Sequence, residues 1–255
     1  MTDSKTPLSW RESIQAGNFE QAEARIQALE LVGEYHPELL AAVQAMVALL
    51  GDVRSRQFSK ALQQTRALEP LREFLSPEEL RLGIENLQQT EKQDTRDPEA
   101  LKAQLQTALD TPYVRAEALN RLGVLQVRLK DPVQARSLFE AAVQADPRHY
   151  RAISNLGNIA LEAGNNKEAE AHYRKALEIN PEYPLAHNNL AVLLRKQKRY
   201  GASIQSLKKS QRLEQRALLQ QAREEGRQQS MNLRLGAIAF YVVLVLLVLW
   251  FVLSR

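Results

Sequence analysis

The four histidines are the side chains best suited to chemistry in this chain of 255 residues, because it contains no cysteine. None of them lies four residues from another histidine with a carboxylate partner, which is the spacing of a helical metal site. The chain also lacks a glycine-rich phosphate loop and a Gly-x-Ser-x-Gly elbow. We therefore expect no enzymatic activity, no metal and no cofactor. The histidines read as structural or surface residues: His36, His149, His172 and His187.

Composition predicts an all-α chain. Strand-like runs of Val, Ile and Thr are absent outside the C-terminal tail. Lys and Arg number 34 against 30 Asp and Glu, which gives a net charge of +4. The basic residues gather near the C-terminal tail without interleaved aromatics, so we expect no nucleic-acid partner.

Two segments, 116–149 and 150–183, carry the same residue types at the same places, 34 positions apart. A period of this length is typical of a helix-turn-helix solenoid. Each segment has a glycine where two helices must approach closely and a proline where the second helix stops. The recurring positions are Leu122-Gly123 and Leu156-Gly157, Ala135 and Ala169, Phe139 and Tyr173, Ala142 and Ala176, and Asp146-Pro147 and Asn180-Pro181.

This pattern resembles the tetratricopeptide repeat (TPR) family. The resemblance fills almost every signature position of 116–183 and is weaker over 184–217, where Gln215 stands in place of the closing proline. It implies a solenoid that presents a surface to partner proteins. Because nothing stops the last helix, the chain from Ala202 to about Gln229 reads as one long helix.

The domain organisation follows from these patterns and from a polar stretch at 89–99. Upstream, Gly17–Ala22 and Gln57–Ala61 echo Gly164–Ala169, so we expect degenerate repeats there, with an unrelated helical bundle as the alternative. The expected segments are 1–88 degenerate helical repeats, 89–99 polar linker, 100–217 TPR-like repeats (116–149, 150–183 and 184–217), 218–234 basic juxtamembrane helix and 235–253 transmembrane anchor.

Residues 235–253 carry no charge, and about twenty apolar residues span a bilayer as a helix. Eleven Lys or Arg lie between Arg195 and Arg234, and Arg255 alone lies beyond the apolar run. The positive-inside rule then predicts a tail-anchored, single-pass membrane protein with a cytoplasmic N-terminal body. A bacterial inner membrane is the preferred location, and a eukaryotic tail-anchored protein is the alternative. The basic helix adds a secondary expectation of contact with anionic lipid headgroups.

The resemblance also implies which residues face a partner, because the first helix of each TPR pair lines a concave groove. Asparagine offers a partner backbone both a donor and an acceptor, and arginine pairs with carboxylates. We therefore expect other proteins or extended peptides as partners. The groove residues predicted by register are Asn120, Arg121, Arg151, Asn155, Asn158, Asn188, Asn189 and Arg195.

Some members of the family clamp a C-terminal carboxylate with asparagines and basic residues. Asn158 and Asn189 match that pattern, whereas Ser154 and Leu219 stand where the clamp has lysines. The alternative is that these asparagines only cap and pack helices.

These features together predict a membrane-anchored interaction scaffold that recruits or assembles proteins at the cytoplasmic face through a TPR groove. Two alternatives stay open: a chaperone-docking or targeting receptor for client C-terminal peptides, and a structural subunit of a membrane complex. Self-association is also open, because solenoid ends with imperfect caps can pair.

Overall fold

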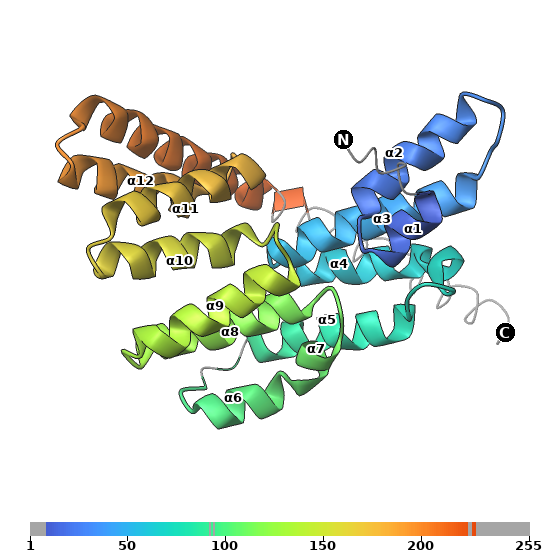
Figure 1. The fold of residues 1–255 in the computed structure, drawn as a ribbon, viewed down its shortest axis with the longest axis horizontal. Helices are drawn as coiled ribbons and strands as arrows, with labels where there is room; N and C mark the ends of the chain where they lie inside the picture. The colour runs from blue at the N-terminus through green and yellow to red at the C-terminus, as the bar shows by residue number, and fades with distance from the viewer. Residues whose placement is uncertain (1–8, 92, 94, 224–225, 228–255) are drawn as a thin grey trace, which may run out of the picture. The chain divides into compact units, whose positions relative to one another are not determined.

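The computed structural model describes residues 9–91, 93, 95–223 and 226–227. This part of the chain is helical and contains no strand, as the sequence predicts. The helices are α1 Trp10–Gln15, α2 Phe19–Glu30, α3 Pro37–Arg54, α4 Phe58–Gln64, α5 Pro77–Glu91, α6 Pro98–Gln104, α7 Gln106–Asp110, α8 Arg115–Arg128, α9 Pro132–Ala145, α10 Tyr150–Glu162, α11 Asn166–Ile179 and α12 Pro184–Lys196, with 3-10 turns η1 Thr65–Ala67 and η2 Glu69–Leu71 (Figure 1). Residues 200–223 form a further helix.

The predicted membrane location is corrected by the structure. Among the residues that the structure describes, no helix combines the length and the apolar character needed to cross a bilayer. The single-pass membrane placement, with its cytoplasmic body and bacterial inner membrane, is therefore contradicted. The predicted transmembrane helix at 235–253 and most of the basic segment 218–234 lie outside the described residues.

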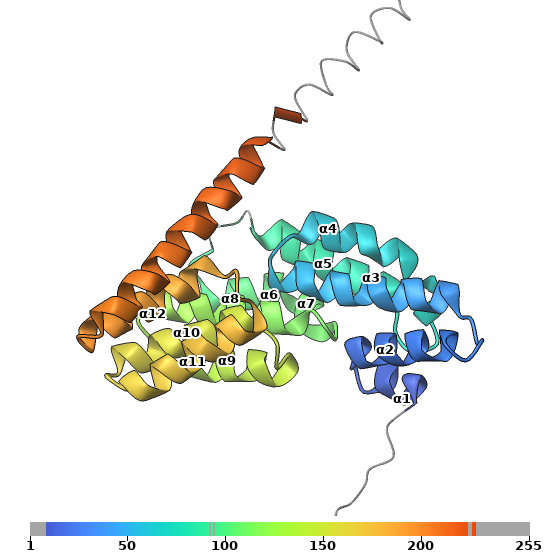
Figure 2. The same cartoon turned by 90° about the horizontal axis from the view of Figure 1, so that it is seen from above.

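The chain divides into two compact units, Met1–Pro181 and Glu182–Arg255. In the first unit, consecutive helices pack against one another from α1 through α5, and α7 then leads to α8. The pairs α8 with α9 and α10 with α11 lie side by side in both ribbon views (Figures 1 and 2). In the described part of the second unit, α12 is followed by the helix at 200–223.

One apolar core runs through the first unit from Ile14 in α1 to Leu125 in α8. It contains large side chains with no exposed surface, among them Phe19, Met46 and Leu87. The N-terminal helices and the first well-formed repeat therefore share a core, since burial of apolar surface is the main stabilising term in folding.

Glycine and an aromatic ring set the close contact inside each repeat. A Cβ on Gly123 would lie 2.5 Å from Phe139 Cε1, and one on Gly157 would lie 2.6 Å from Tyr173 Cε1. Both rings are fully buried. Only glycine leaves room for these rings, which explains the recurrence of the glycine and aromatic at a period of 34.

The turn inside each helix pair also recurs. In every case a residue with positive φ stands two positions before the first residue of the second helix. A small, buried residue stands five positions after that positive-φ residue. The pattern holds for α1–α2, α3–α4, α8–α9, α10–α11 and the pair formed by α12 with residues 200–223. The positive-φ residues and their small partners are Gly17 and Ala22, Arg56 and Ala61, Lys130 and Ala135, Gly164 and Ala169, and Lys198 and Ser203.

Candidate partner-binding site

The first turn of α8 holds a carboxylate that is completely enclosed. The Glu117 side chain has no exposed surface. Its Oε1 lies 3.2 Å from Arg121 Nε and 3.5 Å from Arg56 Nε, and its Oε2 lies 3.2 Å from His149 Nε2. Asn120 Nδ2 donates to the same Oε2 at 3.2 Å. A buried charge requires partners of this kind, because burial alone disfavours ionisation.

Burial on its own would raise the pKa of Glu117. The hydrogen bond and charge of His149, together with the charges of Arg121 and Arg151, outweigh burial and lower this pKa to about 2. Glu117 is therefore ionised throughout the neutral range, and it fixes the positions of the cations around it.

The N-terminal helices supply further partners of this cluster. Arg121 Nη1 donates to the Leu87 carbonyl oxygen at 2.6 Å and to Thr90 Oγ1 at 2.8 Å. The Arg121 guanidinium also lies 5.0 Å from the centre of the Phe58 ring. Arg56 pairs with Glu91 at 3.0 Å. Helices α4, α5 and α8 are thus joined through charged groups.

His149 connects the cluster to α10. It is the N-cap residue of that helix, and its Nδ1 accepts from the Ala152 backbone N–H at 3.2 Å. Its other ring nitrogen, Nε2, lies 3.2 Å from Glu117 Oε2, so the ring stands between α8 and the start of α10. His149 is buried, with 1% of its surface exposed, and its ring contacts both α8 and α10.

The face of α10 carries three of the predicted groove residues at positions i, i+4 and i+7: Arg151, Asn155 and Asn158. All three are half-buried. Asn155 Nδ2 donates to Asn120 Oδ1 at 3.0 Å, which fixes the orientation of its amide. Asn158 Oδ1 accepts from the Tyr173 hydroxyl at 2.8 Å. Two of these three side chains have a polar atom that forms no hydrogen bond with the described chain.

Those two atoms are Arg151 Nε and Asn155 Oδ1. The Arg151 Nε is buried and has no hydrogen-bond partner among the described residues, and the same holds for Arg56 Nε, Arg121 Nη2 and His149 Nε2. The described chain likewise provides no donor to Asn155 Oδ1, since this side chain bonds through its Nδ2. Buried charged donors without a partner are rare in folded proteins, and an unfilled binding site is one physical reason for them.

Arginines outnumber carboxylates in the cluster around Glu117. Within the described part of this cluster, Arg56, Arg121 and Arg151 face two carboxylates, Glu91 and Glu117. The surplus cation favours an anionic group at this site.

The remaining predicted residues are distributed differently. Asn120 is 3% exposed and Arg121 belongs to the buried cluster, so both support the site from inside instead of lining its surface. Asn188 and Asn189 are half-buried and Arg195 is exposed on α12, in the second unit. Leu185 and Val192 are exposed on the same helix, with 52% and 41% of their surface accessible.

Sequence reasoning missed the contributions of Arg56 and Glu91, because nothing in the repeat pattern brings α3, α5 and α8 together. The echo of Gly164–Ala169 at Gln57–Ala61 is the one signal that could have placed Arg56 at a repeat turn. Among the described residues, no group of three or more His, Asp or Glu is arranged to hold a metal ion.

The fold defines a helical-repeat class of protein. Models of the tetratricopeptide repeat match residues 114–182 and 154–217. The chain therefore carries tetratricopeptide repeats over this region, as the sequence predicted, and the repeats support a protein–protein interaction scaffold.

Curated relatives match only short segments. Human protein O-mannosyl-transferase TMTC1 is 42% identical over 59 residues, which cover 23% of this chain and 7% of that protein. The probable UDP-N-acetylglucosamine–peptide N-acetylglucosaminyltransferase SPINDLY of Hordeum vulgare is 34% identical over 34% of this chain and 9% of its own. The uncharacterized protein ycf37 of Pyropia yezoensis is 33% identical over 28% and 40%. The matches thus span less than half of each of these proteins.

Solved structures of MamA also resemble the chain. One covers 82% of this chain and 96% of its own at 14% identity and a TM-score of 0.38. Another covers 69% and 92% at 18% identity and a TM-score of 0.41.

Proposed function

We propose that the chain is an interaction scaffold that binds a carboxylate-bearing segment of a partner protein on the α10 face of the first unit. The observation that carries the proposal is the buried Arg151 Nε without a partner, next to Asn155, whose Oδ1 is oriented but unused. Its function is binding, without catalysis.

The chemistry of the two groups selects the ligand. A guanidinium with an unused N–H is matched by a carboxylate, which gives a short, charge-assisted hydrogen bond. The Asn155 oxygen, held in place by Asn120, is an acceptor for a backbone N–H of an extended peptide. Together they fit an acidic side chain, or a chain terminus, and the peptide bond beside it.

A docking receptor for C-terminal peptides is the second form of this proposal, since a terminal carboxylate has the same chemistry. Ser154, at a position where the family's clamp has lysine, is buried at 1% exposure, so it adds no cation to the site. We therefore favour an acidic side chain within the partner. Amidation of a peptide's C-terminus distinguishes the two forms.

The test uses the full chain as bait for short fluorescein-labelled peptides that contain aspartate and glutamate, each made with a free and an amidated C-terminus. We expect binding that Arg151→Ala weakens about tenfold or more, because one buried charge-assisted contact is lost. Asn155→Ala should weaken it by a smaller factor. Binding that survives amidation identifies a side-chain carboxylate.

Arg174→Ala is the matched control, since Arg174 is exposed on α11 and pairs with Glu170 within its own helix. This variant should bind like the unchanged protein. Equal binding by the Arg151 and Arg174 variants, with both folded by circular dichroism, would show that α10 is not the binding face. The predicted α12 residues Asn188, Asn189 and Arg195 would then be tested in the same assay.

A further inference from the structure

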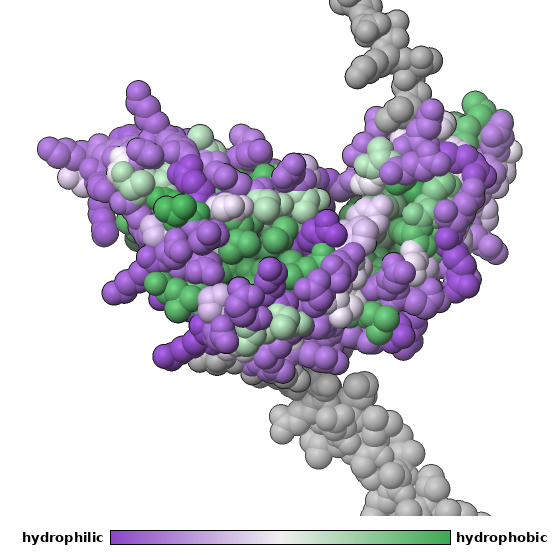
Figure 3. Space-filling model, turned by 60° about the horizontal axis from the view of Figure 1, so that its bottom comes forward, coloured by the Kyte–Doolittle hydropathy of each residue, from purple (hydrophilic) through white to green (hydrophobic). Residues whose placement is uncertain are grey.

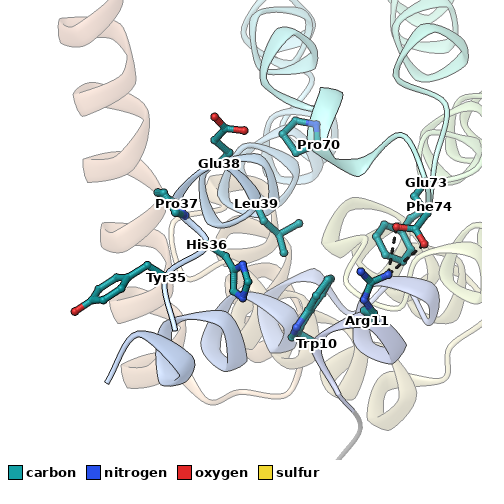
Figure 4. A pocket seen from close by; sticks show the side chains of 10 residues that line it. All are labelled: Trp10, Arg11, Tyr35, His36, Pro37, Glu38, Leu39, Pro70, Glu73 and Phe74. Atoms are coloured by element: carbon teal, nitrogen blue, oxygen red, sulfur yellow. Dashed lines mark hydrogen bonds and ion pairs between the residues drawn. The ribbon is translucent and has the colours of Figure 1, made fainter. Parts of the chain in front are cut away.

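A pocket of about 480 Å³ lies between the start of α1, the α2–α3 loop and the segment after η2, and the proposed peptide site does not use it. Figure 4 shows His36 and Leu39 on the α3 side, with Trp10 and Phe74 across from them. The lining residues are Trp10, Arg11, Tyr35, His36, Pro37, Glu38, Leu39, Pro70, Glu73 and Phe74.

Three aromatic rings that contact one another line this pocket. The Trp10 ring centre lies 6.3 Å from that of Phe74 with their planes at 74°, and 6.4 Å from that of His36 at 46°. The three rings come from three separate segments of the chain. Their mutual contacts hold this lining in a fixed shape.

Arg11 and Glu73 form an ion pair in one wall of the pocket. The Arg11 guanidinium donates to both Glu73 oxygens at 3.1 and 3.2 Å and lies 4.7 Å from the centre of the Trp10 ring. Arg11 is therefore already engaged. Glu38 lines the opposite wall, is exposed, and has no ion-pair partner among the described residues.

The rim beside Glu38 is apolar and accessible. Leu31, Val32 and Tyr35 on the α2–α3 loop expose 89%, 73% and 71% of their surface. The hydropathy view shows patches of green side chains on a largely purple surface (Figure 3). Exposed apolar groups gathered on one loop indicate an interaction surface more often than isolated ones do.

We propose that this pocket, which we call the Trp10 pocket, binds an extended proline-rich segment of a partner protein that carries an arginine or lysine. Proline-rich segments adopt the polyproline II conformation and dock on grooves lined by aromatic rings. Trp10 and Phe74 line the pocket with such rings, the exposed Tyr35 ring projects from its edge, and Glu38 is the carboxylate left to pair with a cation (Figure 4). The apolar loop beside the pocket extends the contact beyond a single residue, which favours a chain segment over a compact small molecule.

The test measures fluorescence anisotropy of three short labelled peptides with the full chain. The first is proline-rich with an arginine at each end, the second has glutamates in place of the arginines, and the third has alanines in place of the prolines. We expect the first to bind, and the other two to bind about tenfold more weakly or not at all. Glu38→Lys should weaken the first peptide by about tenfold, and Tyr35→Ala by a few-fold.

Both substituted side chains are exposed, so the variants should keep the fold, which circular dichroism checks. Tyr200→Ala and Glu178→Lys are controls with the same chemistry at exposed positions elsewhere, and they should leave binding unchanged. Equal binding of the arginine and glutamate peptides overturns the proposal. Self-association through this pocket also overturns it. That outcome would appear as a molecular mass that rises with protein concentration, a rise that Glu38→Lys abolishes, while none of the peptides binds.

Discussion

At the scale of single residues, Glu117 decides how the charges of the first unit are arranged. It has no exposed surface, and Arg121, Arg56 and His149 converge on its two oxygens. Removing one partner of a buried ion pair destabilises the fold more than replacing both partners with apolar residues, because the remaining charge is left buried without a counter-charge.

Glu117→Gln tests this arrangement. We expect the free energy of unfolding to fall by about 3–5 kcal/mol, since the amide keeps the shape but leaves the arginines without a counter-charge. Urea denaturation followed by circular dichroism measures the change. Glu140→Gln is the control: Glu140 is 57% exposed and lies 3.8 Å from Arg136, and its loss should cost less than about 1 kcal/mol. Equal losses in the two variants would contradict the role of Glu117.

The same carboxylate predicts a pH dependence. The pKa of Glu117 falls from 4.5 to about 2 on folding, so its ionised form stabilises the folded state above pH 4.5 and this contribution fades as the pH falls towards 2. Urea denaturation at several pH values between 6 and 3 should show the unchanged protein losing stability as the pH falls below about 4.5. The gap between it and Glu117→Gln should shrink in parallel, and a constant gap would contradict the lowered pKa.

The sequence placed Asn120 and Arg121 by register on a helix that lines a groove, and they do lie together on α8. It could not show that they are enclosed, because their burial depends on Leu87, Thr90 and Phe58 from helices with no clear repeat signature. Arg151 and Asn155 were reachable from the sequence, since their exposure depends on α10 within a well-formed repeat. Their status as a binding site stays a proposal.

At the scale of helices, the shared turn is the feature that the sequence showed least clearly. Positive φ at Arg56, Lys130 and Lys198 matches positive φ at Gly17 and Gly164. Because non-glycine residues also occupy this position, a glycine signature alone does not find it. The small residue five positions later is the better guide. It supports the prediction of degenerate repeats upstream, which stays a prediction.

Lys130→Gly tests the cost of that turn. Lys130 is exposed and holds φ at 63°, a conformation that glycine adopts without strain. We expect the unfolding free energy to rise by up to about 1 kcal/mol. Gly164→Ala, the reverse change at the equivalent turn, should lower it by about 1 kcal/mol, since φ there is 81° and no described atom lies within 4 Å of the added methyl group. Thermal denaturation compares the two, and shifts of the same sign would contradict the shared turn.

Gly123→Ala tests the contact inside the first repeat. The added methyl group would meet the buried Phe139 ring at 2.5 Å, so we expect a loss of about 1–3 kcal/mol from overpacking. Gly51→Ala is the matched control, because Gly51 lies within α3 and has no described atom within 4 Å of a Cβ. That change should stabilise by about 0.5–1 kcal/mol through helix propensity. Urea midpoints moving in opposite directions would support both assignments, and a neutral Gly123→Ala would refute the first.

At the scale of the first unit, residues that precede the predicted linker at 89–99 contact residues that follow it. Asn86 in α5 donates to the Gln104 carbonyl oxygen at 2.7 Å and accepts from the Ala108 N–H at 3.3 Å. Composition showed a polar stretch there, and α5 ends at Glu91 while α6 begins at Pro98. It could not show the contacts, because a single asparagine in a helix gives no sign of a partner eighteen or more residues away.

Arg54 joins the end of α3 to the turn before α10. It donates to both oxygens of Asp146, at 2.7 and 3.1 Å, and the two side chains expose only 12% and 14% of their surface. Tyr150 donates to Ser55 Oγ at 3.2 Å beside this pair. These contacts link α3 directly to a repeat that is distant in sequence, so the helices on both sides should open together.

Arg54→Ala should therefore speed amide hydrogen exchange in α3 and in α9–α10 at once, and lower the unfolding free energy by about 2–4 kcal/mol, because Asp146 is left largely buried without its bidentate partner. The control is Arg81→Ala, which removes an ion pair confined to α5, where Arg81 meets Glu85 with 48% and 35% of their side chains exposed. That variant should change exchange in α5 by little, since exposed pairs contribute below about 1 kcal/mol. Exchange that rises in α3 alone after Arg54→Ala would mean that the N-terminal helices and the repeats unfold separately, and the two would then have to be treated as separate binding modules.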